Sequence, residues 1–190
     1  MSIENVIQDS INLKKAILSD SNFIKKIEDA ASLCVSSLQH GGKIHFCGNG
    51  GSAADAQHLA AELSGRFYYD RPALNAEALH VNSSYLTAVA NDYSFDMIYS
   101  RMIDASANQG DVLFAISTSG NSKNIIKAIE TAKKKNIAVI GMTGKTGGMM
   151  NEMCDILLNV PSTCTPRIQE AHIMIGHIIC EIIESTIFPK

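Results

Sequence analysis

The sequence predicts an α/β protein, a three-layer α/β/α sandwich on a parallel sheet of about five strands. Two observations lead to this prediction. Strand signals alternate with helix signals along most of the chain, and such alternation gives parallel strands joined by right-handed crossovers. In addition, residues 137–141 form the apolar run Ile-Ala-Val-Ile-Gly, which is typical of a strand buried on both faces of a parallel sheet.

The first 40 residues carry apolar side chains at helical spacing, and the polar cluster from Ser19 to Asn22 interrupts them. We expect two helices here with a cap between them, arranged as a helical hairpin. The α/β core is expected to occupy residues 42–190. Because no linker divides the chain, residues 1–190 are predicted to form a single domain.

A strand, a polar loop and a helix follow one another twice. The first unit has a strand at 43–47, the loop Gly48-Asn49-Gly50-Gly51-Ser52 and an alanine-rich helix at 53–63. The pattern returns 68 residues later, counted from Gly42 to Gly110, with a strand at 110–115, a polar loop at 117–122 and a helix to residue 135. Ligands of parallel sheets bind outside the carboxyl ends of the strands, so both loops are candidate binding sites.

The remaining elements complete the alternation. We expect strands at 76–81 and 155–160, and helices at 84–90 and 95–107 that are separated by a break at Asn91-Asp92. The last helix is expected to begin at Thr165, whose hydroxyl can cap it, with Pro166 at the first helical position. Its apolar pattern continues through Ile187.

Composition excludes several classes of function. The chain has 16 Lys and Arg against 19 Asp and Glu, a net charge of −3, which argues against a broad electrostatic hold on nucleic acid or anionic membrane. An anionic ligand would have to be held locally. The five cysteines are scattered and odd in number, so we interpret them as reduced thiols. With no secretory signal and no membrane span in the sequence, we expect a cytoplasmic protein.

The loop Ser117-Thr118-Ser119-Gly120-Asn121-Ser122 offers four hydroxyls and the free N–H groups of the helix that follows. These groups can cradle a phosphate without any lysine. The alternative is a Ser/Thr turn that only caps the helix, and composition leaves the two interpretations equally open.

The earlier loop, residues 48–52, is glycine-rich but is neither a dinucleotide-binding fingerprint nor a Walker loop. Glycines at such a turn let backbone N–H groups approach a ligand closely. A tight turn from strand to helix is the alternative, and the loop by itself does not distinguish them.

His58 and Glu62 lie four residues apart on the predicted helix that follows, so both project from one face, and Asp55 is three residues before His58. An imidazole and a carboxylate so placed can share a metal ion or act as an acid/base group. They can also be an ordinary surface pair. Arg66 is expected to be an ion-pair partner of Glu62.

The last helix carries Gln169, His172 and His177 among aliphatic residues. We interpret His172 as a satisfied core histidine. Gln169 and His177 are eight residues apart, which corresponds to about 80° of rotation and about 12 Å of rise. They share a face of the helix but not a position along it.

Four separated motifs together resemble those of the phosphoheptose isomerases, a family of the sugar isomerase (SIS) domain superfamily. They are the run from Gly48 to Leu63, the break at Asn91-Asp92, the loop 117–122, and Gln169-Glu170-Ala171-His172 with His177. The resemblance extends over essentially the whole chain. It implies a flavodoxin-like strand order and N-terminal helices, residues 1–40, that take part in oligomerisation.

The resemblance also implies an activity, the conversion of sedoheptulose 7-phosphate to D-glycero-D-manno-heptose 7-phosphate for lipopolysaccharide or capsule. It implies a homotetramer with shared active sites and one zinc ion per site. Glu62 would be the base and His177 the acid. The zinc ligands would be His58, Glu62, Gln169 and His177. The phosphate would be held by Ser52, Ser117, Thr118, Ser119 and Ser122, and the sugar chain would meet Asn49, Gly50, Gly51, Asn91, Asp92 and Gln169.

The residue types suit this reaction. A 2-ketose becomes an aldose when a proton moves between C1 and C2 through a cis-enediol, and one carboxylate can remove and return that proton. Zinc ligands lie about 2 Å from the metal, so Gln169 and His177 on one straight helix would strain to reach one ion. Either the helix is irregular at Gln169, or the two residues come from different subunits, which we favour.

Two other functions are compatible with an SIS-like sequence. One is a non-catalytic SIS protein of the type that associates with a replication initiator and binds a protein partner. The other is a regulatory SIS module that binds a different phosphosugar. The first does not require Glu62 and His177 together, whereas this chain has both.

Overall fold

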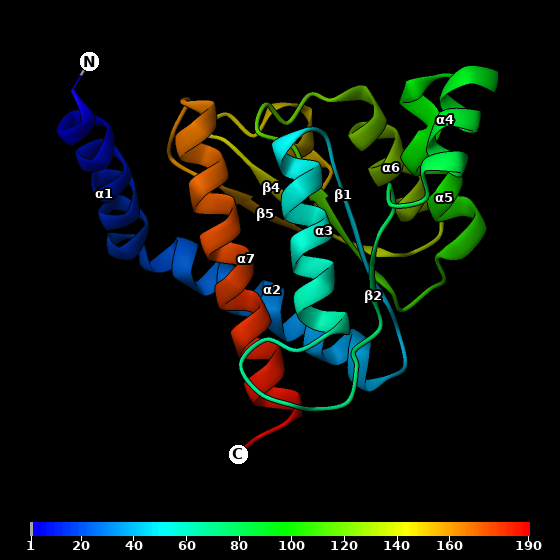
Figure 1. Ribbon diagram of the computed structural model, residues 1–190, viewed down its shortest axis with the longest axis horizontal. Helices are drawn as coiled ribbons and strands as arrows, with labels where there is room; N and C mark the ends of the chain where they lie inside the picture. The colour runs from blue at the N-terminus through cyan, green and yellow to red at the C-terminus, as the bar shows by residue number, and fades with distance from the viewer. Residues whose placement is uncertain (1) are drawn as a thin grey trace.

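The computed structural model describes residues 2–190 and has the expected α/β architecture (Figure 1). Five strands form one sheet in the order β2-β1-β3-β4-β5, and each neighbouring pair is parallel. This is the doubly wound order of flavodoxin, as the resemblance implies. The strands are β1 (Ile44–Gly48), β2 (Ala76–Ala78), β3 (Val112–Ile116), β4 (Ala138–Thr143) and β5 (Ile156–Asn159).

Helices cover both faces of the sheet and bury two apolar cores. One core lies under α1, α2, α3 and α7, and the other under α4, α5 and α6. The helices are α1 (Ile3–Ser19), α2 (Ser21–Gln39), α3 (Gly51–Ser64), α4 (Ser83–Asp92), α5 (Ile98–Ser106), α6 (Lys123–Lys134) and α7 (Thr165–Ile187), with short 3-10 helices η1 (Phe95–Met97) and η2 (Gly148–Glu152). In residues 2–190 no helix is both long and apolar enough to cross a membrane.

The strands β1 and β3 explain why their segments of the sequence are largely apolar and do not alternate between apolar and polar residues. Every residue of β1 and β3 is buried, because each strand has a core on both sides. Phe46 and Phe114 face one core with their rings stacked at 5.2 Å, whereas Cys47 and Leu113 face the other. The paired residues Ile44 and Val112 are 68 apart in the chain, so the sequence repeat corresponds to two strands lying side by side.

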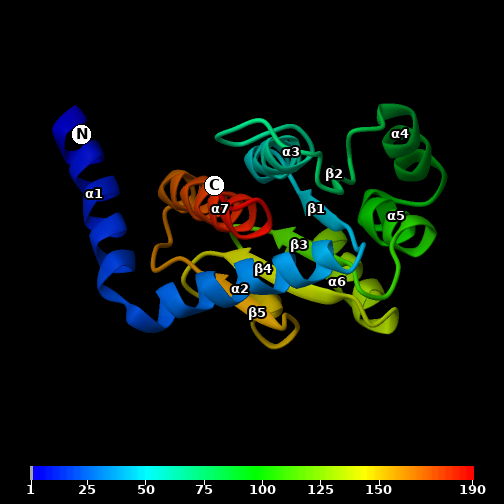
Figure 2. The same ribbon diagram turned by 90° about the horizontal axis from the view of Figure 1, so that it is seen from below.

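The N-terminal helices are joined as expected but do not lie along each other. Asp20 caps α2 by accepting a hydrogen bond of 3.0 Å from the N–H of Phe23. Figure 2 shows α1 leaving α2 at a wide angle, so the hairpin is open. Helix α2 buries a long apolar stripe in the core, whereas α1 buries only Leu13 and Ile17. Thus α2 belongs to a layer of the sandwich.

Several boundaries differ from the expectation. Asn91-Asp92 is not a break, since both residues lie in the last turn of α4 and the chain turns away at Tyr93. The N–H of Tyr93 still bonds the carbonyl of Val89 at 3.0 Å, which extends the helix past the expected end. Thr165 does not cap α7; it is the first helical residue, and Cys164 stands at the N-cap without a side-chain bond.

Candidate active site

The two polar loops lie side by side at the carboxyl edge of the sheet, because Gly48 at the end of β1 pairs with Ile116 at the end of β3. The side chains of Asn49, in the first loop, and Asn124, in the first turn of α6 after the second loop, are joined by two reciprocal hydrogen bonds of 2.9 and 2.8 Å. Asn124 is 2% exposed. It was not among the residues singled out in the sequence, where its only signal is an amide on the buried face of a helix.

Three serine hydroxyls gather in the second loop. Ser117 Oγ lies 3.1 Å from Ser122 Oγ and 3.5 Å from Ser119 Oγ. Ser122 occupies the N-cap position of α6 but makes no capping hydrogen bond with its side chain. The hydroxyls therefore remain available to an anion beside the free N–H groups of α6. This geometry favours the phosphate cradle over the simple helix cap.

The first loop adds backbone groups and one buried hydroxyl to this edge. Gly50 has a φ of +55°, which glycine adopts without strain, and α3 begins directly after it. Ser52 stands in the first turn of α3 and is only 3% exposed. Thr118 lies half-buried in the second loop next to Ser117. Both loops thus present donors at the same edge.

Asn91 and Asp92 lie at the surface, and they do not contact the cradle through any hydrogen bond of the described residues. Both residues are exposed at the end of α4, and Asn91 Nδ2 donates a hydrogen bond of 2.9 Å to Asp92 Oδ1. Within residues 2–190 no hydrogen bond connects either side chain to the two polar loops. Their expected contact with a sugar therefore stays a prediction.

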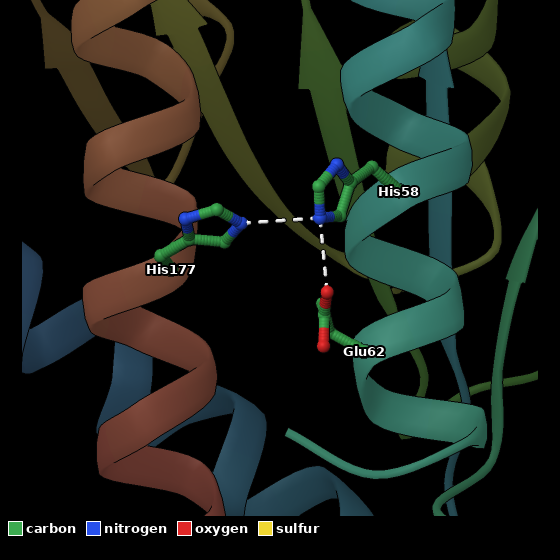
Figure 3. Close-up of side chains that lie close together, drawn as sticks. All are labelled: His58, Glu62 and His177. Carbon is green, nitrogen blue, oxygen red and sulfur yellow. Dashed lines mark hydrogen bonds and ion pairs between the residues drawn. The ribbon is translucent and has the colours of Figure 1, made fainter. Parts of the chain in front are cut away.

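His58, Glu62 and His177 form a compact trio between α3 and α7 (Figure 3). His58 Nε2 lies 2.9 Å from Glu62 Oε1 and 3.3 Å from His177 Nε2. The trio is open to solvent on one side, with 48% of the His58 side chain and 24% of the Glu62 side chain exposed. His58 and Glu62 are adjacent because they are four residues apart on α3. His177 reaches them because α7 packs against α3.

The trio has the dimensions of a metal site. Its three ligand atoms all lie within 4.8 Å of one another. Two ligands of a tetrahedral ion with bonds of 2.0–2.1 Å are about 3.3 Å apart, and the two histidine nitrogens have this separation. Imidazole nitrogen and carboxylate oxygen are common ligands of divalent metals. The three side chains can therefore hold one divalent ion.

Gln169 does not join the trio within the chain. Its side-chain amide lies against Gly51, in the space that a Cβ at that position would fill. Gly51 precedes His58 by seven residues, which is about 10 Å along α3. Helix α7 continues without interruption from Thr165 to Ile187, so an irregularity near Gln169 is not the explanation. Gln169 therefore stands apart from the trio of its own chain, and its expected role as a metal ligand stays a prediction.

Two charged residues near the trio, Asp55 and Arg66, are candidate partners of His58 and Glu62. Asp55 lies one turn before His58, and burial raises its pKa to about 6, although the nearby His58 opposes this shift. Its Oδ2 atom is buried without a hydrogen-bond partner among the described residues. Arg66 makes no ion pair with Glu62 in the described part of the chain, so that expectation was wrong. Helix α3 ends at Ser64, so Arg66 lies outside the helix and is not placed one turn after Glu62 on the same face.

The two remaining histidines of interest have structural roles. His172 is fully buried, which confirms it as a core residue, and its Nε2 contacts the carbonyl oxygen of Thr143 at 3.1 Å. Its Nδ1 has no hydrogen-bond partner among the described residues, so only one of its two ring nitrogens is satisfied. His45 is also buried and lies 3.0 Å from Asp111 Oδ2 at the opposite edge of the sheet. Neither histidine is part of the site.

A doubly wound sheet with a hydroxyl cradle and an imidazole/carboxylate trio is the arrangement of a phosphosugar-handling α/β domain. A family model described as "SIS domain" matches residues 9–144. The phosphoheptose isomerase of Aneurinibacillus thermoaerophilus is 52% identical over 98% of this chain and 94% of its own length. Phosphoheptose isomerase 2 of Campylobacter jejuni is 52% identical over 99% and 94%.

A solved structure gives the same assignment. The phosphoheptose isomerase of Neisseria gonorrhoeae matches with a TM-score of 0.90 and 43% identity, over 96% of this chain and 97% of that chain. The chain belongs to the SIS-domain family and, within it, to the phosphoheptose isomerases. It is therefore an aldose–ketose isomerase, which favours the enzyme over the two non-catalytic alternatives.

Proposed function

We propose that the chain converts sedoheptulose 7-phosphate to D-glycero-D-manno-heptose 7-phosphate, which supplies heptose for lipopolysaccharide or capsule. The observation that carries this proposal is that Ser52, at the beginning of α3, and His58 of the trio stand on the same helix at a fixed separation. Ser52 precedes His58 by six residues, about 9 Å along α3. An extended seven-carbon sugar with phosphate on C7 places C1 and C2 at such a distance from the phosphate.

The roles of the residues follow from their chemistry. Glu62 is the base that removes a proton from C1 and returns it to C2, through a cis-enediol. His177, on the facing helix, moves protons at the two oxygens. Phosphate is bound by the hydroxyls of Ser52, Ser117, Thr118, Ser119 and Ser122, and the sugar chain meets Asn49, Gly50, Gly51, Asn91, Asp92 and Gln169. Because the Asn49 amide is held by Asn124 and its carbonyl accepts a bond from the N–H of Ser52, its backbone N–H is the group left to meet the sugar in this proposal.

We also propose that the site binds one zinc ion, held by His58, Glu62, His177 and Gln169. The ligand types and the spacing of the trio support this proposal. A bound zinc ion supplies Lewis acidity that stabilises negative charge on the sugar oxygens. A carboxylate next to a cation is a weaker base, so the ion and the basicity of Glu62 act against each other.

Self-association into a homotetramer with shared sites is part of the same proposal. Apolar side chains that are more than 40% exposed lie along α1, namely Ile3, Ile7, Ile11 and Leu18, and such surfaces favour an interface. Since Glu62 and His177 already meet within one chain, Gln169 is the residue that a second subunit would supply. A cytoplasmic location is proposed as well, because scattered cysteines in odd number suit a reducing compartment.

Mixed oligomers test the shared site. Chains with Glu62→Gln and chains with Gln169→Ala, each inactive alone, should regain activity when they are unfolded together and reassembled. Chains with Glu62→Gln and His177→Ala should not, because both defects then fall in the same trio. If the two mixtures regained the same activity, or if neither regained any, the proposal that a second subunit supplies Gln169 would be contradicted.

The reaction itself is tested with the purified chain. Sedoheptulose 7-phosphate is incubated with the protein and zinc, and the anomeric proton of the aldose is followed by NMR. We expect this signal to appear and to depend on the protein concentration. If no aldose forms with zinc supplied, the proposed reaction is wrong.

A further inference from the structure

A buried ion pair lies beside the trio and is not explained by the fold alone. Arg71 Nε and Glu184 Oε1 are 3.0 Å apart, and the two side chains are only 2% and 1% exposed. Burial of two charges costs about as much free energy as their attraction returns, so such a pair is weak evidence for stability. The hydrogen bonds of the pair connect it to the end of α3 and to the loop that follows.

The guanidinium of Arg71 closes the end of α3. It donates hydrogen bonds to the carbonyl oxygens of Glu62, at 2.9 Å, and Leu63, at 2.7 Å, and also to that of Gly65, at 2.8 Å. The last carbonyls of a helix lack partners within the helix, and a positive charge there suits the helix dipole. Glu62 lies only two residues before the end of α3 at Ser64. Without Arg71, the turn that carries Glu62 would fray.

The carboxylate of Glu184 fastens the loop after α3 to α7. It accepts hydrogen bonds from the N–H groups of Phe67, at 2.9 Å, and Tyr68, at 2.8 Å. Burial alone would raise the pKa of Glu184, but these two bonds and the Arg71 guanidinium outweigh it and hold the pKa below its ordinary value. Glu184 is seven residues after His177, so it lies two turns further along the same face of α7.

The fastened loop also touches the trio. The ring of Phe67 lies 5.6 Å from the ring of His177, measured between centroids. Arg71 is thus bonded to the residue that carries the carboxylate of the trio, while Glu184 stands on the helix that carries its second imidazole. The pair therefore connects the end of α3, which carries Glu62, with α7, which carries His177.

We propose that Arg71 and Glu184 are positioning residues of the isomerisation, because they fix the last turn of α3 and the loop 65–71 against α7 and thereby set Glu62 and Phe67 relative to His177. The proposal rests on the function proposed above. Neither side chain is proposed to touch the substrate. The phosphate cradle stands at the opposite end of α3, so loss of the pair affects the chemical step and leaves phosphate binding unchanged.

The test uses three variants and one matched control, all as full chains. Arg71→Met and Glu184→Gln each remove one partner, and the double variant removes both charges. The control is Asp111→Asn, because Asp111 is also a buried carboxylate that accepts two backbone N–H bonds and contacts a basic side chain, at the other edge of the sheet. For each protein kcat, KM and the melting temperature are measured, with rates expressed per folded molecule.

We expect the double variant to melt higher than Arg71→Met, since it leaves no unpaired buried charge. Its kcat should nevertheless stay at least about tenfold below that of the unaltered chain, with KM changed by less than about threefold, as for a displaced catalytic group. Asp111→Asn should lower the melting temperature and leave kcat unchanged. A double variant or a stable Glu184→Gln variant with unaltered kcat would overturn the proposal.

A second measurement does not depend on turnover. The ring C–H resonances of His177, assigned by their loss in His177→Asn, should shift in Glu184→Gln and stay in place in Asp111→Asn. Unshifted resonances in Glu184→Gln would contradict the positioning role even if the enzyme proved to act on another sugar. Conversely, shifted resonances without any turnover by the unaltered chain would leave the positioning of His177 intact and overturn the proposed reaction.

Discussion

The Nε2 atoms of His58 and His177 lie 3.3 Å apart, although 119 residues separate them in the chain. Helices α3 and α7 run side by side to make this contact (Figure 1). Their close approach depends on Gly176, because a Cβ there would come within 2.6 Å of the Leu59 side chain. The trio is thus a product of helix packing, and its chemistry can be tested by changing one member at a time.

Removal of metal tests the ligand role of the trio. We expect the chain to bind one zinc ion and to lose activity after treatment with a chelator, with recovery when zinc is returned. His58→Ala should weaken zinc binding by more than about tenfold, since even hydrogen-bonded partners of metal ligands contribute that much. Zinc content and affinity are measured by atomic absorption and competition with a chelating dye. The surface variant His40→Ala should bind zinc like the unaltered chain.

The hydroxyl cradle should control substrate affinity. Ser122→Ala removes one hydroxyl from an anion site, and a hydrogen bond to a charged group contributes about 1.5–3 kcal/mol. We therefore expect KM to rise about tenfold or more, with a smaller change in kcat. Inorganic phosphate should inhibit the unaltered chain competitively and the variant more weakly. Ser106→Ala, at the exposed end of α5, serves as the control, and equal KM values in the two variants would contradict the cradle.

The contribution of His172 to stability should fall in mild acid, whereas Asp55, whose pKa is raised to about 6, adds a contribution of opposite sign. Burial lowers the pKa of His172 to about 4, against the ordinary 6.5, although its bond to Thr143 opposes the shift. Between these two values the unfolded chain binds more protons at His172, so this contribution to the free energy of unfolding decreases as pH falls through this window and is fully retained above it. Burial also lowers the pKa of His45, which adds a decrease of the same sign.

The expected loss from His172 is about 2 kcal/mol between pH 7 and pH 5. Urea unfolding at fixed chain concentration measures it. The variant His172→Gln, which keeps a donor for the Thr143 carbonyl, should lose correspondingly less stability over the same pH range. Identical losses in the variant and the unaltered chain would show that His172 is not the source.

The parallel sheet could be predicted from the sequence because its signals are local, whereas the order of its strands came only from the resemblance to the phosphoheptose isomerases. Uniformly apolar strands such as Ala138–Thr143 and a strand-loop-helix unit that recurs in the chain require no knowledge of distant contacts. The pair His58 and Glu62 was equally accessible, since four residues of helix bring both to one face. The four hydroxyls of loop 117–122 were visible as well, but only the geometry of Ser122 separates a cradle from a cap.

Other features depend on contacts between distant residues and leave no local pattern. Arg71 and Glu184 are 113 residues apart, and neither stands out among the charged residues of the sequence. The position of Gln169 against Gly51 follows only from the packing of α7 on α3. The open angle between α1 and α2 likewise depends on packing, because α2 buries a long apolar stripe in the core and α1 buries little. A cap at Asp20 is compatible with both an open and a closed hairpin.

The catalytic role of Glu62 is the central claim, and the rate of the Glu62→Gln variant tests it most directly. The side chains have nearly the same shape, but the amide cannot accept a proton. With sedoheptulose 7-phosphate as substrate, kcat should fall by about 10²–10⁴-fold, the usual contribution of a general base, while the melting temperature stays close to that of the unaltered chain. A folded Glu62→Gln variant whose kcat remains within about threefold of the unaltered value would contradict the claim.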